Sequence, residues 1–107
     1  MTNNEDKFIP IRKGLLEFVV LKVIRKEKVY AADILEALSR TEFATQEGTL
    51  YPMLSRLKRE QLVEYEWVES EAGPPRKYYL LTAKGEAQLE SLNQYWRELD
   101  KTIKKLA

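Results

Sequence analysis

The chain of 107 residues contains neither histidine nor cysteine. Without an imidazole, catalytic triads of the Ser-His-Asp and Cys-His types are excluded. Zinc sites built from His and Cys are excluded as well, and there is no disulfide framework to indicate an oxidising compartment. We expect no metal and no cofactor.

Long hydrophobic runs are also missing. The first six residues are polar and acidic, unlike the basic start and apolar run of a signal peptide. The longest apolar stretch, from Leu15 to Ile24, is interrupted by Glu17 and Lys22 and is too short to span a bilayer. We therefore expect a cytoplasmic protein with no membrane association.

An excess of charge of either sign is absent too. Lys and Arg number 18 against 17 Asp and Glu, which gives a formal net charge of +1. A strongly basic balance is the usual footprint of nucleic-acid binding. The charges are unevenly distributed, however: residues 1–28 hold 7 basic and 4 acidic groups, whereas residues 62–82 hold 2 and 4. Contact with DNA would therefore depend on a few placed cations, and non-specific affinity should be low because it rests largely on phosphate neutralisation.

The periodicity of the apolar residues predicts four helices and a hairpin. Residues 1–10 form an expected flexible segment, followed by helices over 11–26, 31–40, 46–61 and about 83–105. A strand is expected over 62–68, where Val63, Tyr65 and Trp67 alternate with glutamates, and a second strand over 77–81. A turn or loop over 70–75, which contains Gly73-Pro74-Pro75, is expected to join them. Thr45 and Thr82 are expected to cap the third and fourth helices, since their hydroxyls can accept free N–H groups of the first turn.

This order of elements is that of a winged helix-turn-helix. The expected fold class is mainly α (α+β), with a winged helix-turn-helix domain over 11–82 that binds DNA. Residues 83–107 are expected to form a long C-terminal dimerisation helix.

The first and last helices carry more apolar surface than a small domain can cover. Apolar residues surround the first helix, which indicates burial on more than one side. Those of the last helix repeat at intervals of three and four, as in a coiled-coil seam. A second subunit would cover both, and the expected dimer interface comprises Leu15, Phe18, Val19, Leu89, Leu92, Trp96, Leu99, Ile103 and Leu106.

The third helix has a narrow core stripe of Leu50, Leu54 and Leu57. Its opposite face carries small residues, hydroxyls and arginine, which suit a DNA major groove, although a merely solvated face would also be polar. Pro52 counts against the latter, because a proline beyond the first turn costs a helix about 3 kcal/mol. Near the expected turn, Arg76 and Lys77 would probe phosphates or the minor groove, or would only keep the turn soluble. The residues expected to contact DNA are Arg12, Lys13, Tyr30, Gly48, Thr49, Tyr51, Pro52, Ser55, Arg56, Arg59, Arg76 and Lys77.

Three segments resemble a known family. Residues 47–58, which contain Thr49-Leu50-Tyr51-Pro52, resemble the signature of the PadR-like transcriptional regulators, the phenolic-acid-responsive repressor family. The run Arg76-Lys77-Tyr78-Tyr79-Leu80-Leu81-Thr82 resembles the family's wing strand, and residues 30–34 its Tyr-Gly-Tyr-Glu-Ile motif, with Ala31 and Ala32 replacing Gly and Tyr. Gln61 stands where the family commonly has glycine. The resemblance covers residues 11–106.

The resemblance implies a homodimeric repressor of the short subfamily, which binds an inverted-repeat operator in double-stranded DNA and releases it on binding a small effector. Trp96 and its symmetry mate could stack on a planar aromatic effector, or could serve interface packing alone. The expected effector-binding residues are Trp96, Tyr95, Leu92, Leu99 and Phe18.

The sequence also bears on two classes of function other than a regulator. A winged-helix protein-interaction module without DNA binding is the alternative, because Glu47, Glu60, Glu64 and Glu66 lie close to the expected DNA-contacting residues. An enzyme is not expected, since the carboxylates lie on helix surfaces and an exposed strand face with no apolar pocket implied around any pair.

Overall fold

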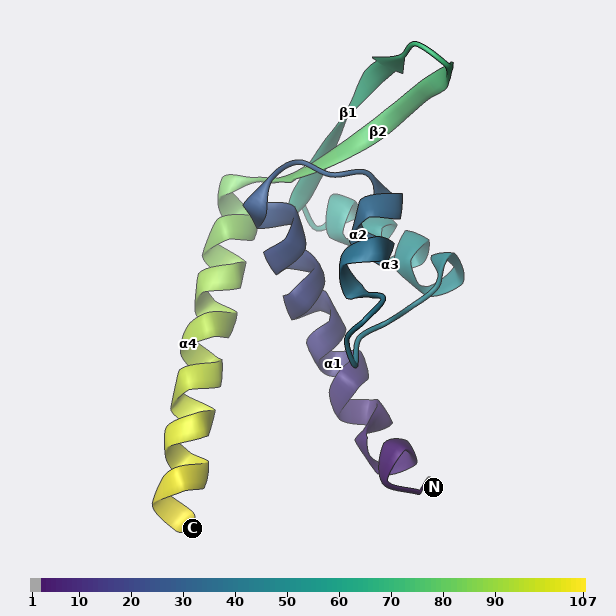
Figure 1. Cartoon of the computed structure of the whole chain (residues 1–107). Helices are drawn as coiled ribbons and strands as arrows, with labels where there is room; N and C mark the ends of the chain where they lie inside the picture. The colour runs from purple at the N-terminus through teal and green to yellow at the C-terminus, as the bar shows by residue number, and fades with distance from the viewer. Residues whose placement is uncertain (1–2) are drawn as a thin grey trace.

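The computed structural model describes residues 3–107 and contains four helices and one hairpin in this range. The helices are α1 (Asn3–Lys26), α2 (Ala31–Leu38), α3 (Glu47–Arg59) and α4 (Ala83–Leu106). Strands β1 (Val63–Ser70) and β2 (Gly73–Leu81) form an antiparallel pair between α3 and α4. The predicted fold class and order of elements are confirmed. Figure 1 shows the hairpin projecting from one end of the helical body, with both termini at the opposite end.

Helix α1 is longer than predicted. It begins at Asn3 rather than at residue 11, so residues 3–10 are helical and not an irregular segment; residues 1 and 2 lie outside the described range. Pro10 lies inside this helix and has no N–H to donate to the preceding turn. The ribbon changes direction near this end of α1 in Figure 1, as expected where a proline interrupts the hydrogen-bond ladder.

The core lies where the C-terminal half of α1 meets the other elements. Val20, Leu21 and Ile24 of α1 are buried against apolar residues of α2, α3, the hairpin and α4. Helix α3 contributes the predicted stripe of Leu50, Leu54 and Leu57, all buried. Burial of each such side chain is worth about 1.5–3 kcal/mol, so this core fixes α3 with its opposite face directed to solvent.

Both ends of α3 are closed by backbone hydrogen bonds. The helix is capped by Gln46 in extended conformation and not, as predicted, by Thr45; no side chain accepts a capping hydrogen bond there. At the other end, the N–H of Leu62 donates to the Leu57 carbonyl at 2.9 Å and that of Gln61 to the Lys58 carbonyl at 3.0 Å. This pair of bonds is a Schellman motif over residues 57–62, whose next-to-last residue adopts the left-handed conformation. Gln61 accordingly has φ of 64°.

The hairpin is longer than predicted, and its turn is shorter. The chain reverses at residues 71–72, within the predicted loop, but Gly73, Pro74 and Pro75 belong to β2. In a two-stranded sheet each strand has one unpaired edge, so a proline without an N–H is tolerated there. Arg76 and Lys77 therefore lie within the ladder, opposite Val68 and Trp67, and not at the turn.

The junction between the hairpin and α4 is tightly packed. Thr82 caps α4 as predicted, because its Oγ1 accepts a hydrogen bond of 2.9 Å from the N–H of Gly85. The same hydroxyl donates to the Gln61 carbonyl at 2.7 Å. The backbone of Leu62 lies so close to Gly85 that a side chain at position 85 would overlap the Leu62 carbonyl oxygen.

Helices α1 and α4 diverge away from the hairpin. The C-terminal part of α1 is held to the N-terminal half of α4 by two contacts. Arg25 forms an ion pair with Glu86 at 3.3 Å, and Lys22 donates a hydrogen bond of 3.3 Å to Asn93. Figure 1 shows the two helices separating toward the termini. The radius of gyration of 15.7 Å exceeds the roughly 13 Å of a compact domain of this size. The diverging ends leave apolar side chains of both helices in solvent.

Candidate nucleic-acid interface

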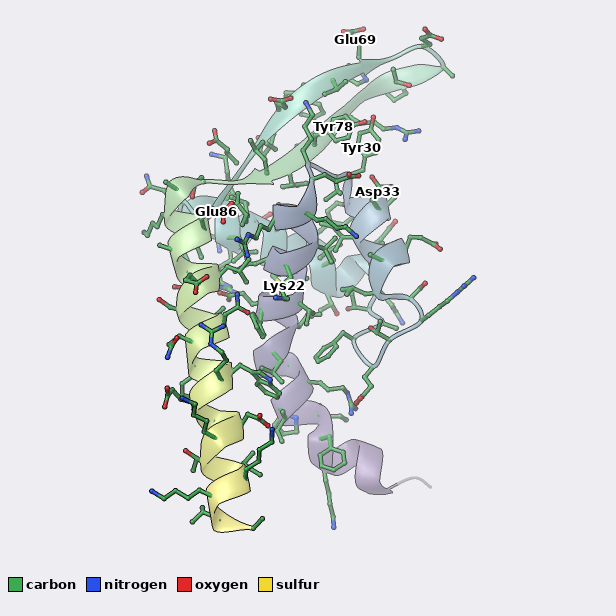
Figure 2. The ribbon with its side chains drawn as sticks, turned by 60° about the vertical axis from the view of Figure 1, so that its left-hand side comes forward. Lys22, Tyr30, Asp33, Glu69, Tyr78 and Glu86 are labelled. Atoms are coloured by element: carbon green, nitrogen blue, oxygen red, sulfur yellow. The ribbon has the colours of Figure 1, made fainter. Side chains whose placement is uncertain are left out.

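A stack of aromatic and basic side chains fixes the hairpin to the helical body. The rings of Tyr30, which precedes α2, and Tyr78 of β2 are stacked with centroids 3.9 Å apart, and Figure 2 shows them side by side. Arg76 lies over the outer face of Tyr30 at 5.0 Å, and Lys28 lies 5.4 Å from the ring of Tyr78. A hydrogen bond with Tyr30 raises the pKa of Tyr78. Tyr30 thus holds the hairpin at a set angle to α2.

The backbone reinforces this attachment. Val29 and Tyr79 form an isolated β-bridge with N–H···O distances of 3.1 and 2.8 Å. The N–H of Tyr30 donates to Asp33 Oδ2 at 3.1 Å, which ties the start of α2 to the same point. The hairpin is therefore a wing whose base is hydrogen-bonded to the segment that precedes α2.

The other face of the wing is directed toward α3. Alternate residues of a strand share a face, and the register places Tyr65 opposite Tyr79 and Trp67 opposite Lys77 on this one. The Lys77 ammonium lies 4.4 Å from the centre of the Tyr65 ring and 5.4 Å from that of Trp67. Such cation–π contacts hold a lysine side chain in place without neutralising its charge.

A cavity of about 500 Å³ separates this wing face from α3. It is lined by Tyr51 and Ser55 of α3, by residues at the start of α2, and by the wing residues Trp67, Pro75, Arg76, Lys77 and Tyr79. Five predicted DNA-contacting residues meet here: Tyr30, Tyr51, Ser55, Arg76 and Lys77. The sequence separates them by up to 47 positions, and the fold brings them to one surface.

A second hollow, of about 200 Å³, lies on the opposite side of α3. Arg12 and Lys13 of α1 line it together with Thr49 of α3, so three further predicted residues share a surface. Because Thr49 contributes to this hollow and Tyr51 and Ser55 to the first, the exposed face of α3 runs between two groups of basic side chains.

Arg56 of α3 is paired with two carboxylates and is not a free cation. Its Nη2 lies 2.7 Å from Glu17 Oε1 of α1, and its Nη1 lies 3.1 Å from Glu60 Oε1. The hydrogen bond with Glu17 is the main cause of the raised pKa of Arg56. The expectation that Arg56 grips DNA is therefore not supported by its position: its charge is engaged in holding α3 against α1.

The remaining predicted residues of α3 are exposed. Gly48, Pro52 and Arg59 face solvent and line neither cavity. Gly48 has no neighbouring atom within 4 Å of the position where a Cβ would be, so this part of α3 is unobstructed. Arg59 forms no ion pair with a carboxylate in the part of the chain that the structure describes.

The residues predicted at the dimer interface differ in their exposure. Leu89 is only 1% exposed and packs in the core of the protomer, so its assignment to the interface is wrong. An a/d pattern alone cannot show which positions of a helix face the home domain. Trp96, Ile103 and Leu106 are exposed, at 46%, 59% and 79%, whereas Leu15, Phe18, Val19, Leu92 and Leu99 are half-buried.

An apolar cleft of about 160 Å³ lies between α1 and α4. Of the predicted effector-binding residues, Phe18 and Trp96 line it, whereas Tyr95, Leu92 and Leu99 do not. The other lining residues are Leu15, Val19 and Phe43. Phe43 was missed because it lies in the connection after α2, where no periodicity marks it as packed.

Trp67 is the other residue that the sequence analysis missed. Its strand pattern puts it on the same face as Tyr65, but the pattern does not show what lies opposite that face.

Between residues 3 and 107, none of the helices combines the length and apolarity needed to cross a membrane.

The fold and this surface define a winged helix-turn-helix protein. The chain belongs to the PadR-like family of transcriptional regulators, whose family model matches residues 20–91. Members of this family are DNA-binding regulators and not enzymes, as the sequence analysis predicted.

Solved structures of related proteins agree with this assignment. The chain is 46% identical to a PadR-like transcription factor from Bacteroides fragilis, with a TM-score of 0.81 over 99% of this chain and all of that one. It is 39% identical to a PadR-like transcriptional regulator from Bacillus cereus, with a TM-score of 0.79 over 88% and 92% of the two chains. An uncharacterized protein of Lysinibacillus sphaericus is 30% identical over 96 residues, which cover 87% of this chain and 88% of that protein.

Proposed function

We propose that the protein is a homodimeric repressor that binds an inverted-repeat operator in double-stranded DNA through α3 and the wing. The observation that carries the proposal is the continuity of the exposed α3 face with the basic wing. Tyr51 and Ser55 of α3 line the same cavity as Arg76 and Lys77. A helix in the major groove and a neighbouring wing on the sugar–phosphate backbone is the contact that this arrangement suits.

Small and hydroxyl-bearing residues on α3 favour close approach to DNA. Gly48 and Ser55 allow the helix backbone to come near base edges, and Arg59 presents a guanidinium that suits guanine or phosphate. On the opposite side of α3, Lys13 is exposed beside Thr49 and suits the phosphates of the second strand.

A second copy of the chain would cover the apolar surfaces that α1 and α4 leave open. Phe8 and Ile11 of α1 are 50% and 57% exposed, and the C-terminal half of α4 presents Trp96, Ile103 and Leu106. Contiguous exposed apolar surface of this kind marks an interaction site. A two-fold dimer should place its α3 helices about 34 Å apart, one turn of DNA, which explains the symmetry of an inverted-repeat operator.

The apolar cleft supports an effector site at the same interface. At about 160 Å³ it is smaller than the roughly 300–1,000 Å³ of typical ligand sites. A second copy would add a further wall and a second Trp96. A planar aromatic compound stacked on these indoles would change how the two protomers are spaced, and thereby release the operator.

DNA binding is tested with a gel shift on a duplex from upstream of the protein's own gene, at several salt concentrations. We expect affinity to fall steeply with salt and to fall in Arg59→Ala. Lys101→Ala, on α4 far from the wing, is the matched control and should bind as the wild type does. Binding that is insensitive to salt, or unaffected in Arg59→Ala, would contradict the placement of α3. A dimer that binds no duplex would favour the protein-interaction module instead.

Dimerisation is tested by light scattering on Ile103→Asp. A buried carboxylate at the seam should dissociate the dimer, since an unpaired charge in an apolar interface is costly. Lys101→Asp introduces the same carboxylate two residues away, on the opposite face of α4, and should leave the dimer intact. A monomeric wild-type protein would refute this part of the proposal.

The effector site is tested with Trp67→Phe, which leaves Trp96 as the sole indole of the two in the chain. Titration with planar aromatic compounds should change the Trp96 emission, and compounds that do so should weaken operator binding. Emission that stays unchanged across such a panel would show that Trp96 serves packing alone.

A further inference from the structure

Trp67 has an unusual position for so large an apolar side chain. It lies on the wing face directed toward α3, yet it is 61% exposed. Its ring makes an edge-to-face contact with Tyr65, at 6.1 Å between centroids, and lies 5.4 Å from the Lys77 ammonium. A tryptophan can bury about 150–250 Å², so most of its contact surface is unused in the isolated chain.

The cavity that Trp67 lines combines three kinds of chemistry. Aromatic faces come from Trp67, Tyr51 and Tyr79, a hydroxyl comes from Ser55, and positive charge comes from Arg76 and Lys77. In the part of the chain that the structure describes, neither cation is paired with a carboxylate; both lie over aromatic rings. Aromatic faces beside unpaired cations are the elements that proteins use to hold a nucleic-acid strand.

We propose that this cavity holds one nucleotide of the operator backbone, with Trp67 packed on its deoxyribose and Lys77 on its phosphate. The inference rests on the proposed DNA binding through α3. If α3 occupies the major groove, the strand that borders this groove must pass between α3 and the wing, and the cavity lies there. Its volume of about 500 Å³ exceeds what one sugar–phosphate unit requires, so the adjoining residues of the strand can enter and leave.

The wing residues have two different roles in this arrangement. Trp67 and Lys77 contact DNA, whereas Tyr30 and Tyr78 are positioning residues that set the wing angle through their stack. Removal of Trp67 should therefore weaken binding without changing its salt dependence, since an indole neutralises no phosphate. Removal of Lys77 should do both.

The direct test uses Trp96→Phe, in which Trp67 is the only indole, and a duplex obtained by selection from random sequence with the wild-type protein. We expect the Trp67 emission to change on addition of this duplex and to saturate at two protomers per operator. The reciprocal variant Trp67→Phe reports Trp96 alone and should show a smaller change, because the cleft between α1 and α4 lies at a distance from the wing.

Affinity measurements supply the second readout. Trp67→Ala should bind the selected duplex about tenfold more weakly with an unchanged slope of log K against log salt, and Trp67→Phe should recover most of the loss. Lys77→Ala should reduce that slope by about 1 per protomer, while Lys101→Ala should not. Thermal unfolding of each variant shows whether the wing remains folded.

Two failures are distinguishable. Wild-type protein that selects no duplex contradicts both this inference and the proposed function. Protein that binds its selected duplex with unchanged Trp67 emission, or with full affinity in Trp67→Ala, overturns the nucleotide site and leaves the proposed function standing.

Discussion

Glu17 of α1 and Arg56 of α3 form an ion pair with 2.7 Å between Oε1 and Nη2, across 39 positions of sequence. The guanidinium also contacts Glu60, one turn further along α3. The side chains of Arg56 and Glu17 are 38% and 20% exposed, so water screens the pair only in part. One arginine of the helix that we propose reads DNA is thus used to seat that helix on its scaffold.

The first prediction separates the two arginines of α3. Arg56→Gln should lower the free energy of unfolding by about 1 kcal/mol, near the upper end for a partly exposed pair, as measured by urea denaturation. Arg59→Gln should leave stability within about 0.5 kcal/mol and reduce DNA affinity more than Arg56→Gln does. A double-mutant cycle with Glu17→Gln should show coupling, and purely additive effects would refute the pairing.

Two glycines provide an opposed pair of substitutions. Gly85→Ala would drive a methyl group into the Leu62 carbonyl, and we expect a loss of about 2–3 kcal/mol from this overpacking. Gly14 of α1 has open space around it, so Gly14→Ala should gain about 0.5–1 kcal/mol from helix propensity. Urea denaturation gives both values, and equal effects of the two substitutions would contradict the close approach at position 85.

Gln61 occupies a position that favours glycine. Its φ of 64° costs a residue with a side chain about 1–2 kcal/mol. Gln61→Gly should therefore stabilise the protein by about 1 kcal/mol and raise its melting temperature, while Glu60→Gly next to it should destabilise. A loss of stability in Gln61→Gly would mean that the left-handed turn does not form in solution.

Tyr79 should make the fold sensitive to alkali. Burial is the main cause of its raised pKa, so the unfolded chain releases the phenolic proton at lower pH than the folded chain does. The folded state then binds more protons, and stability falls as pH rises above about 10. Unfolding curves measured between pH 8 and 11 should show a smaller decline in Tyr79→Phe than in the wild type. Identical declines would contradict the burial of the phenol.

Local patterns predicted much of this structure. The leucine stripe of α3, the alternation of Val63, Tyr65 and Trp67 and the capping hydroxyl of Thr82 each depend on residues a few positions apart, and each was confirmed. The errors have local causes as well. Residues before Ile11 were expected to be flexible, yet α1 begins at Asn3 and contains Pro10. Pro74 and Pro75 were expected in the loop of the hairpin, but they lie in β2 on a free sheet edge, where a missing N–H is tolerated.

The candidate site could be predicted only as a set of residues. The sequence identified Tyr51, Ser55, Arg76 and Lys77, yet it could not show that they line one cavity. It could not show that Arg56 is paired with Glu17, because the partner of a long charged side chain depends on which helices pack together. Nor could it place Leu89, since the angle between α1 and α4 decides where the protomer core ends and the open surface begins.

The sequence by itself determined the order of helices and strands, the core-facing stripe of α3 and, through its motifs, the family. These features follow from periodicity and short-range hydrogen bonding. The tertiary structure decided which arginine of α3 is paired with carboxylates, and that Trp67 lines the cavity between the wing and α3. Such properties depend on contacts between segments far apart in the chain, which are fixed only when the core packs.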